Sequence, residues 1–401
     1  MTKIDHTEIR NQLTIRYDPR KSSKIKRKEW KSFKTEFFDE DGKKTEQLLK
    51  NVIYNSLNKS KGRLAISLSS GIDSSLSLGL IREVFPDRKI IAFSAIYEGN
   101  DESKKAKEIA RKLNTDFKTV RINSIFTNMP ELIMITGKPK WNTYQHIIAK
   151  AAKKYSKIMI TGDGADEIFA GYVFRYSKFL NLTKNKSTPL NKIKNYLQCH
   201  NRDWVPDQKN IFGKNINFSW KNIYNYFKVY FSNPLPLLKQ VMFADFNGKL
   251  CYDFIPAGNK IFSKYDLIGF QPFLQKEIID FGLKLPTNEL YNETDIRGKL
   301  ILRKIAKRIK LKHIDEKRGF SLDLFLDWQK NGRNICKNYL LDQNSFIFKQ
   351  KIINYNWIKK AFDLVENDRN ELYLNRLISI LALEVWYRLQ HKEIKSHEQL
   401  M

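Results

Sequence analysis

The segment between residues 68 and 75 has the composition of a phosphate-binding turn. It reads Leu68-Ser69-Ser70-Gly71-Ile72-Asp73-Ser74-Ser75. An apolar run at 64–68 precedes it and predicts a buried strand, and apolar residues recur at helical spacing between 76 and 84. Small residues at such a turn let backbone N–H groups face an anion at the helix N-terminus. Because a carboxylate beside phosphates is repulsive without a cation, Asp73 implies a divalent metal ion, most simply Mg²⁺.

A second cluster of small and acidic residues follows another short apolar run, at 158–160. It reads Thr161-Gly162-Asp163-Gly164-Ala165-Asp166-Glu167. The glycines permit close approach of the backbone, and the cluster brings three carboxylates together. A single acidic residue after a strand is usually a helix cap, whereas three near a phosphate loop favour metal binding and acid-base chemistry.

These two clusters require a parallel sheet to bring them together. Strands are predicted at 64–68, 89–96, 117–122 and 158–160, with helices at 101–113 and 144–155. Strands that alternate with helices indicate an α/β fold with right-handed crossovers. Ligands of such a sheet lie at the carboxyl ends of its strands, where both clusters would emerge.

The chain divides by pattern into three parts. Residues 1–60 predict a basic N-terminal segment and a leading helix, 61–180 an α/β core that binds the phosphates of a nucleotide, and 181–401 a mostly helical substrate-binding and C-terminal region. The Lys- and Asn-rich stretch at 184–194 is predicted to be a loop.

The composition limits the classes of protein to which this chain can belong. With 401 residues, 42% of them hydrophobic, the chain can bury a substantial core. A formal net charge of +29, with basic residues concentrated between 20 and 34, fits either a nucleic-acid partner or a general lysine-rich bias. Three dispersed cysteines argue against a disulfide framework or a zinc site. With no signal-type or membrane-spanning segment in sight, we expect a cytoplasmic protein without membrane contact.

The two clusters together resemble the synthetase domain of the glutamine-dependent, B-type asparagine synthetases, relatives of the PP-loop ATP pyrophosphatases. Further elements are similar to that family in the right order, between about Arg16 and Phe320. They are Asn100-Asp101-Glu102-Ser103, Gly258-Asn259-Lys260, Pro272-Phe273-Leu274, Ile301-Leu302-Arg303-Lys304 and Lys317-Arg318-Gly319-Phe320. The resemblance implies a parallel-sheet PP-loop fold of the adenine nucleotide alpha hydrolase-like type with a helical C-terminal region.

The resemblance also implies roles for individual residues. Those implied to meet ATP are Ser69, Gly71, Asp73 and Ser74 on its pyrophosphate half, with Ala95, Thr161 and Gly162 contacting the nucleotide largely through backbone. Asp73 and Asp166 match magnesium-binding positions. Lys317 matches a lysine that stabilises charge on the phosphates and on the activated carboxylate. Asp163 matches a position that faces the second substrate.

The roles that the resemblance implies are those of an AMP- and pyrophosphate-forming amide ligase. A carboxylate attacking the α-phosphorus of ATP brings two anions together, so a metal ion and a lysine are needed to offset their repulsion. An amine attacking the acyl-adenylate must lose a proton, which Asp163 or Asp253 is expected to accept. Conversion of aspartate to asparagine is the leading interpretation, followed by amidation of a sugar uronate, closure of a peptide or lactam, and modification of an RNA base.

Two departures from the family pattern bear on the substrates. Because the sequence lacks a Met-Cys start, we expect no glutaminase domain ahead of the synthetase part. Nitrogen is then expected from ammonia, from a separate glutaminase subunit or from a substrate amine. Before Pro272 the family commonly has Glu-x-Arg-x, whereas this chain reads Ile268-Gly269-Phe270-Gln271. It thus lacks both the acid and the arginine, which weakens the case for aspartate. Ser70 replaces a glycine of the phosphate loop, which is tolerable if its φ is negative.

Two other classes of function stay open. One is an RNA-binding protein whose PP-loop modifies or senses a bound transcript, which the net charge favours. The other is a noncatalytic scaffold for a separate glutaminase, against which Asp73, Asp166 and Lys317 argue. A homodimer is compatible with either class.

Overall fold

A five-stranded sheet forms the centre of the N-terminal half of the protein. The computed structural model describes residues 5–23, 25–97, 103–311, 323–395, 398 and 400. The strands are β1 (Leu64–Ser67), β2 (Ile90–Ile96), β3 (Asp116–Arg121), β4 (Ile158–Ile160) and β5 (Ile268–Phe270). Their order is β3-β2-β1-β4-β5, and every neighbouring pair is parallel. The predicted α/β class is therefore confirmed.

The strand order places a topological switch beside β1. From β1 the chain adds β2 and β3 on one side, then returns to add β4 and β5 on the other. In open α/β sheets the crevice at such a reversal, outside the carboxyl ends of the strands, is where ligands bind. The loops after β1 and β4 flank this crevice.

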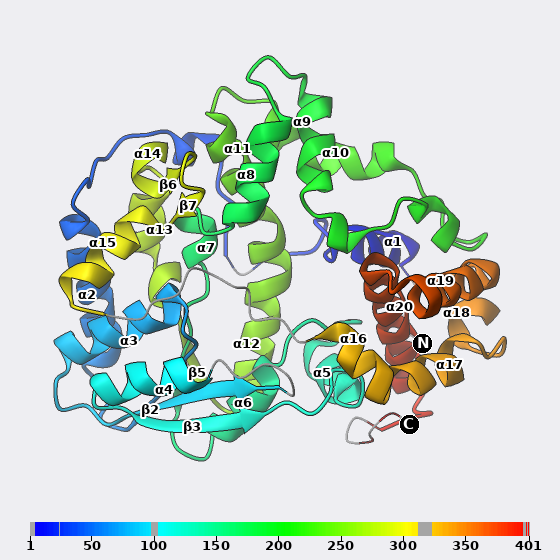
Figure 1. Ribbon diagram of the computed structural model, residues 1–401, viewed down its shortest axis with the longest axis horizontal. Helices are drawn as coiled ribbons and strands as arrows, with labels where there is room; N and C mark the ends of the chain where they lie inside the picture. The colour runs from blue at the N-terminus through cyan, green and yellow to red at the C-terminus, as the bar shows by residue number, and fades with distance from the viewer. Residues whose placement is uncertain are drawn as a thin grey trace.

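Helices cover both faces of the sheet, and Figure 1 shows α3 and α4 on one side of it and α6 on the other. Alternate residues of β1 point to opposite faces, so Leu64 and Ile66 pack in the core that holds Leu76 of α3. Ala65 lies in a second core with Ile148 of α6. Burial on both faces explains why the central strands are almost continuously apolar.

The remaining elements are mostly helical, as predicted for the C-terminal region. The helices are α1 (His6–Ile15), α2 (Lys43–Leu57), α3 (Ile72–Val84), α4 (Ser103–Lys112), α5 (Met129–Thr136), α6 (Gln145–Ala152), α7 (Ala165–Ile168), α8 (Val173–Leu182), α9 (Pro189–Gln198), α10 (Trp220–Phe231), α11 (Leu237–Asp245), α12 (Ile255–Lys264), α13 (Lys276–Gly282), α14 (Thr287–Leu290), α15 (Leu300–Arg308), α16 (Leu324–Asp327), α17 (Arg333–Leu340), α18 (Phe346–Lys349), α19 (Tyr355–Asp368) and α20 (Glu371–Gln390). Shorter pieces are the 3₁₀ turns η1 (Trp30–Phe33), η2 (Asn201–Asp203), η3 (Gln208–Ile211) and η5 (Pro272–Leu274), the π-helical segments η4 (Phe246–Phe254) and η6 (Trp328–Gly332), and a hairpin of β6 (Tyr291–Asn292) with β7 (Arg297–Gly298).

The helices α16 to α20 gather at the side of the molecule away from the sheet (Figure 1). Fifteen of the 20 residues of α20 are buried, because α1, α5, α17, α18 and α19 surround it. Glu384 of α20 is fully buried, and its carboxylate accepts the backbone N–H groups of Phe346 and Ile347 at the start of α18. A buried charge is thus satisfied by hydrogen bonds.

Two details of the fold differ from the sequence prediction. The stretch at 184–194 is not a loop throughout, because α9 begins at Pro189 and Thr188 caps it by accepting the N–H of Asn191. Strand β5 at 268–270 is an addition that the pattern did not indicate. None of the helices in the described part of the chain combines the length and apolar character needed to cross a bilayer.

Candidate active site

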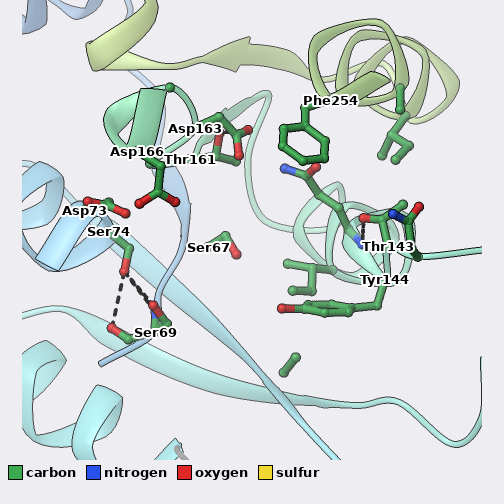
Figure 2. Close-up of a pocket in the computed structure, with 18 of the residues that line it drawn as sticks. Ser67, Ser69, Asp73, Ser74, Thr143, Tyr144, Thr161, Asp163, Asp166 and Phe254 are labelled. Atoms are coloured by element: carbon green, nitrogen blue, oxygen red, sulfur yellow. Dashed lines mark hydrogen bonds between the residues drawn. The ribbon is translucent and has the colours of Figure 1, made fainter. Parts of the chain in front are cut away.

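The loop from β1 into α3 has the geometry of an anion-binding turn. The N–H of Ser69 donates to Ser74 Oγ at 3.0 Å, and the two serine hydroxyls lie 3.1 Å apart (Figure 2). The N–H of Gly71 donates to Ser69 Oγ at 3.2 Å. These bonds fix the turn at the N-terminus of a helix of 13 residues. Ser70 is not among the residues with positive φ, so a serine is tolerated where relatives have glycine.

The second loop, between β4 and α7, closes directly onto the first. A Cβ on Gly162 would lie 2.7 Å from Cβ of Asp73, so only glycine allows this approach. Gly164 has φ +91°, and a Cβ there would collide with Leu274. The backbone N–H of Thr161 donates to the carbonyl of Phe270, so β5 braces the start of this loop from behind.

A lysine that the sequence analysis did not single out lies between the two loops. Lys299 Nζ is 2.6 Å from Asp73 Oδ1 and 2.6 Å from Asp166 Oδ1, and the side chain is 4% exposed. Burial alone would lower the pKa of Lys299, but the two carboxylates outweigh it and hold the pKa above its usual value. In a chain with 72 lysines and arginines, residue type gave no signal, although Lys299 lies two positions before the recognised 301–304 element.

The backbone around Lys299 is arranged around this contact. Lys299 has φ +56°, an unusual value for a residue with a side chain, and its N–H donates to the carbonyl of Phe169. A Cβ on Gly171 would lie 2.0 Å from Asp166 Oδ1 and 2.1 Å from Lys299 Cε. The glycine therefore leaves room for the ion pair.

Asp163 lies at the mouth of the second loop and opens into the cavity described below. The side chain of Asp163 faces the open space of the cavity, and the cavity is enclosed by protein. This separation from bulk water raises the pKa of Asp163. Thr161 donates its hydroxyl to Asp163 Oδ2 at 2.6 Å and Gln145 adds a further hydrogen bond, both of which oppose the rise. A carboxylate with a raised pKa, held by neighbours, is suited to accept a proton.

A third carboxyl group, that of Glu167, is buried beside Asp166. Burial raises the pKa of Glu167 to about 8, and the charge of Asp166 adds to the rise. The Tyr172 hydroxyl donates to Glu167 Oε1 at 2.5 Å, and the guanidinium of Arg175 lies 3.8 Å from the centre of the Tyr172 ring.

A cavity of about 440 Å³ connects these groups. Figure 2 shows Ser69, Ser74, Asp73 and Asp166 on one side of it, with Tyr144 and Phe254 across from them. Lining residues include all of the predicted ATP-contacting positions except Gly71, namely Ser69, Asp73, Ser74, Ala95, Thr161 and Gly162, together with Asp163, Asp166 and Glu167. The structure thus brings two segments about 90 residues apart to one cavity at the switch point, as the sequence indicated.

Two predicted catalytic residues stand apart from this arrangement. Lys317 lies outside the described residues, and so do the neighbouring positions 318–320 and positions 100–102 of the resemblance. Asp253 is buried in η4 and does not line the cavity. Its Oδ1 forms an ion pair with Lys140 Nζ at 2.7 Å, and Lys140 is a lining residue of the cavity. Among the cavity residues, Asp163 is therefore better placed than Asp253 to meet a substrate.

The Asp73 and Asp166 pair fits a magnesium ion. Both carboxylates reach the same cationic group, the ammonium of Lys299, so their oxygens already converge on a position that favours positive charge. Carboxylate oxygens are the ligands that Mg²⁺ prefers, and phosphate oxygens would complete its shell.

Comparisons with known proteins agree with this geometry. The sequence model of a family described as asparagine synthase matches residues 44–388, which is most of the chain. Asparagine synthetase 1 (glutamine-hydrolyzing) of Bacillus subtilis strain 168 is 24% identical over 396 residues, and the match covers 88% of this chain. The chain spans about 60% of the length of that relative.

Solved structures give weaker likenesses. NMN synthetase from Francisella tularensis is 24% identical over 33% of this chain and 58% of its own, with a TM-score of 0.23. The U34-tRNA thiolase NcsA from Methanococcus maripaludis is 12% identical over 86% of this chain and 79% of its own, with a TM-score of 0.31. At these scores neither likeness carries an argument about this protein.

Proposed function

Because the chain belongs to the asparagine synthase family, we propose that it is an ATP-dependent ligase that adenylates a carboxylate and joins it to ammonia or an amine. The observation that carries the proposal is the closure of two loops, after β1 and β4, around Asp73, Asp166 and Lys299. A phosphate-binding turn, a pair of metal-type carboxylates and a buried cation at one switch point are what adenylation requires.

In the first step a carboxylate oxygen attacks the α-phosphorus of ATP and pyrophosphate leaves. The amides at the start of α3, with the hydroxyls of Ser69 and Ser74, would bind the departing phosphates. Asp73 and Asp166 would hold Mg²⁺, which when bound neutralises phosphate charge. Lys299 would shift its contact from these carboxylates toward the phosphates, and Lys317 is proposed to add a second positive charge there.

In the second step the amine attacks the acyl carbon, AMP leaves and the nitrogen loses a proton. We assign the acceptance of that proton to Asp163, because it opens into the cavity and its pKa is raised. General-base help of this kind is worth about 10²- to 10⁴-fold in rate. The hydrogen bonds from Thr161 and Gln145 would keep the carboxylate aimed at the incoming amine.

Aspartate to asparagine is the leading reaction, because the family description and the B. subtilis relative both name asparagine formation. Amidation of a uronate, closure of a peptide or lactam, and modification of an RNA base use the same chemistry on another carboxylate or carbonyl. Free ammonia or a separate glutaminase subunit would supply the nitrogen. Phe270, in the altered 268–271 segment, stands where the family commonly has an arginine, so this chain lacks that positive charge at this position.

The products of ATP cleavage test this proposal. We expect AMP and pyrophosphate, separated by anion-exchange chromatography, when the protein is incubated with ATP, Mg²⁺, ammonium and a panel of carboxylates. The variant D73N should lose at least about 10³-fold in kcat, since it removes a charged group that acts at the phosphates. The matched control D266N changes an exposed aspartate paired with Lys153 and should leave the rate unchanged. ADP as the product, or full activity of D73N, would contradict the mechanism.

A further inference from the structure

A second cavity lies along α12, at a different face of that helix from the proposed ATP site. It is a groove of about 680 Å³ between α12, the second half of α5 and the N-terminal segment at 22–23. None of the described residues that line it also lines the cavity beside the phosphate loop. The groove is therefore a candidate for a second ligand-binding site.

Two lysines of α12 give the groove its charge. Lys260 and Lys264 are four positions apart, so they follow one another along a single face of the helix. Ala257 and Ile261 of the same helix line the other cavity. Asn259 and Lys260 belong to an element of the family resemblance, yet both line the groove and not the proposed ATP site.

This positive charge has no balancing carboxylate. The described residues that line the groove include no Asp or Glu. Lys260 donates to the carbonyl of Thr136 at the end of α5, which uses one of the three N–H donors of its ammonium group. Partial burial and the like charge of nearby Lys138 lower the pKa of Lys260. A bound anion would offset this repulsion between the two lysines.

Carboxylates on the neighbouring elements are engaged with other lysines. Glu131 of α5 pairs with Lys150 of α6 at 2.8 Å. Asp266, in the turn after α12, pairs with Lys153 at 3.1 Å. An anion that enters the groove therefore meets ammonium groups without having to displace either carboxylate.

Neutral polar groups and a short apolar wall complete the groove. The polar residues supply hydroxyl and amide groups, and they are Ser22, Ser23, Asn259 and Ser263. The hydroxyl of Ser23 donates to the carbonyl of Cys251 at 2.7 Å, which fixes the N-terminal segment against η4. The apolar wall consists of Met134, Ile135 and Pro256. Met134 is 49% exposed, so its side chain is available to pack against a ligand.

A phosphate group suits this set of donors. A phosphate monoester has three terminal oxygens, which can accept hydrogen bonds from two ammonium groups and a hydroxyl together, whereas a carboxylate has two oxygens. Lysines one helical turn apart have Cβ atoms about 5–6 Å from each other, so both can reach one phosphate. The apolar wall then favours an organic ester over inorganic phosphate.

We infer that this groove binds a small phosphate ester through Lys260 and Lys264, at a site separate from the proposed ATP site. The ester is either a free metabolite or the headgroup of a lipid, since both present the same phosphate. The inference does not depend on the proposed function, because the two cavities have no described lining residue in common.

Isothermal titration calorimetry at physiological ionic strength tests this site. Saturating α,β-methylene-ATP and Mg²⁺ would occupy the proposed ATP site, so that a second phosphate site is measured by itself. The soluble probes are glycerol 3-phosphate, glucose 6-phosphate and phenyl phosphate, with inorganic phosphate and succinate for comparison. Sedimentation with phosphatidylcholine vesicles, with and without phosphatidic acid, tests the lipid source of the same phosphate.

Three variants separate the groove from the general charge of the protein. K260Q/K264Q removes both ammonium groups but keeps amides that can hydrogen-bond. K104Q/K107Q is the matched control, because it removes the same charge from two exposed lysines of α4. S263F keeps both lysines of the groove and fills the space between its walls.

We expect at least one phosphate ester to bind the wild type and K104Q/K107Q equally. Its affinity for K260Q/K264Q should be about 100-fold lower, because two charge-assisted hydrogen bonds are lost. S263F should bind it at least about 10-fold more weakly, since the phenyl ring occupies the groove. Lys260 also holds the end of α5, so K264Q, with an expected loss of about 10-fold, provides the test if circular dichroism shows that the double variant is unfolded.

Each outcome decides for or against the groove. Binding to vesicles only when they contain phosphatidic acid, and lost in K260Q/K264Q, would uphold the inference and identify a lipid headgroup as the source. Displacement of every ester by α,β-methylene-ATP would overturn it, because the phosphate would then occupy the proposed ATP site. Equal losses in K260Q/K264Q and K104Q/K107Q would overturn it as general attraction to a basic protein. Unaltered binding by folded S263F, or no binding of esters or vesicles at millimolar phosphate, would also overturn it.

Discussion

At the scale of single residues, the ion pairs of Lys299 link folding to chemistry. Without a bound cation, Asp73 and Asp166 would repel one another, and Lys299 prevents this by contacting both at 2.6 Å. The same lysine is positioned to reach phosphates when a metal ion takes over the carboxylates. Lys299 therefore pairs with the two carboxylates in the absence of a metal ion, and we propose that it contacts the phosphates when a metal ion is bound.

We predict that K299M lowers the free energy of unfolding by about 3 kcal/mol in EDTA, because it leaves two neighbouring carboxylates without their cation. Added Mg²⁺ should recover part of this loss in K299M but have little effect on K153M. The control changes a lysine in an exposed pair with Asp266, which is worth at most about 1 kcal/mol. Urea unfolding followed by circular dichroism measures each value, and an unchanged midpoint for K299M would refute the role.

His146 carries a pH dependence of stability. It is 2% exposed in α6, neither ring nitrogen has a hydrogen-bond partner among the described residues, and burial lowers its pKa to about 4. The charge of Glu131 opposes that shift and the charge of Lys150 adds to it. Because the folded-state pKa is below the unfolded value of 6.5, the unfolded chain binds more protons between pH 6.5 and 4. Stability is therefore lost as the pH falls through that window.

For this histidine we predict that wild type loses about 2 kcal/mol more than H146L when the pH falls from 8 to 5. Leucine fills the site without a group that must stay neutral. H6Q, which changes a partly exposed histidine at the start of α1, should follow the wild type. Urea titrations of the three proteins at both pH values provide the comparison, and parallel losses in wild type and H146L would show that His146 does not titrate as argued.

At the scale of elements, the site depends on how closely the loops after β1 and β4 approach. Gly162 is the contact point, because any side chain there meets Cβ of Asp73 at 2.7 Å. The apolar pattern predicted each strand separately. Only the assembled sheet shows that the two loops touch.

The variant G162A should weaken ATP binding about 10-fold or more, since the added methyl group forces the loops apart. G62A is a matched control, because a Cβ on Gly62 would meet nothing within 4 Å. Equilibrium dialysis with labelled ATP measures both affinities. Equal affinities would mean that the loops can separate without losing the phosphate site.

The sequence predicted elements with a strong apolar pattern well, and it predicted poorly the features that depend on contacts distant in sequence. Strands β1, β2 and β4 lie within a residue or so of their predicted positions, because each is a buried apolar run next to a distinctive polar cluster. Strand β5 escaped notice because it has three residues, one of them glycine, and is a strand only by pairing with β4. The sequence analysis missed Lys299 because its partners are far away in sequence. It missed the pairing of Asp253 with Lys140 for the same reason.

At the scale of the whole molecule, the net charge of +29 is the property that most affects behaviour in solution. Such a charge attracts polyanions whether or not they are substrates. The arrangement of described elements offers a cavity for a small substrate, so binding of RNA is expected to be electrostatic rather than specific.

We predict weak binding of a fluorescent RNA oligonucleotide at 50 mM salt that falls at least about 100-fold by 200 mM, with no preference among sequences. Fluorescence anisotropy over a salt series gives the slope. Saturating α,β-methylene-ATP should not displace the RNA. Sequence-selective binding that persists at 200 mM salt would instead favour the RNA-modifying interpretation.

The contact between Lys299 and Asp73 joins residues 226 positions apart. On the ribosome, the phosphate loop and its aspartate emerge long before the lysine that neutralises it, and β5 emerges in the interval between them. Closing so long a loop is slow, because its entropy must be lost before the contact is gained. A nascent chain can therefore complete its proposed ATP site only after residue 299 has been synthesised, and until then the Asp73 and Asp166 carboxylates lack this partner.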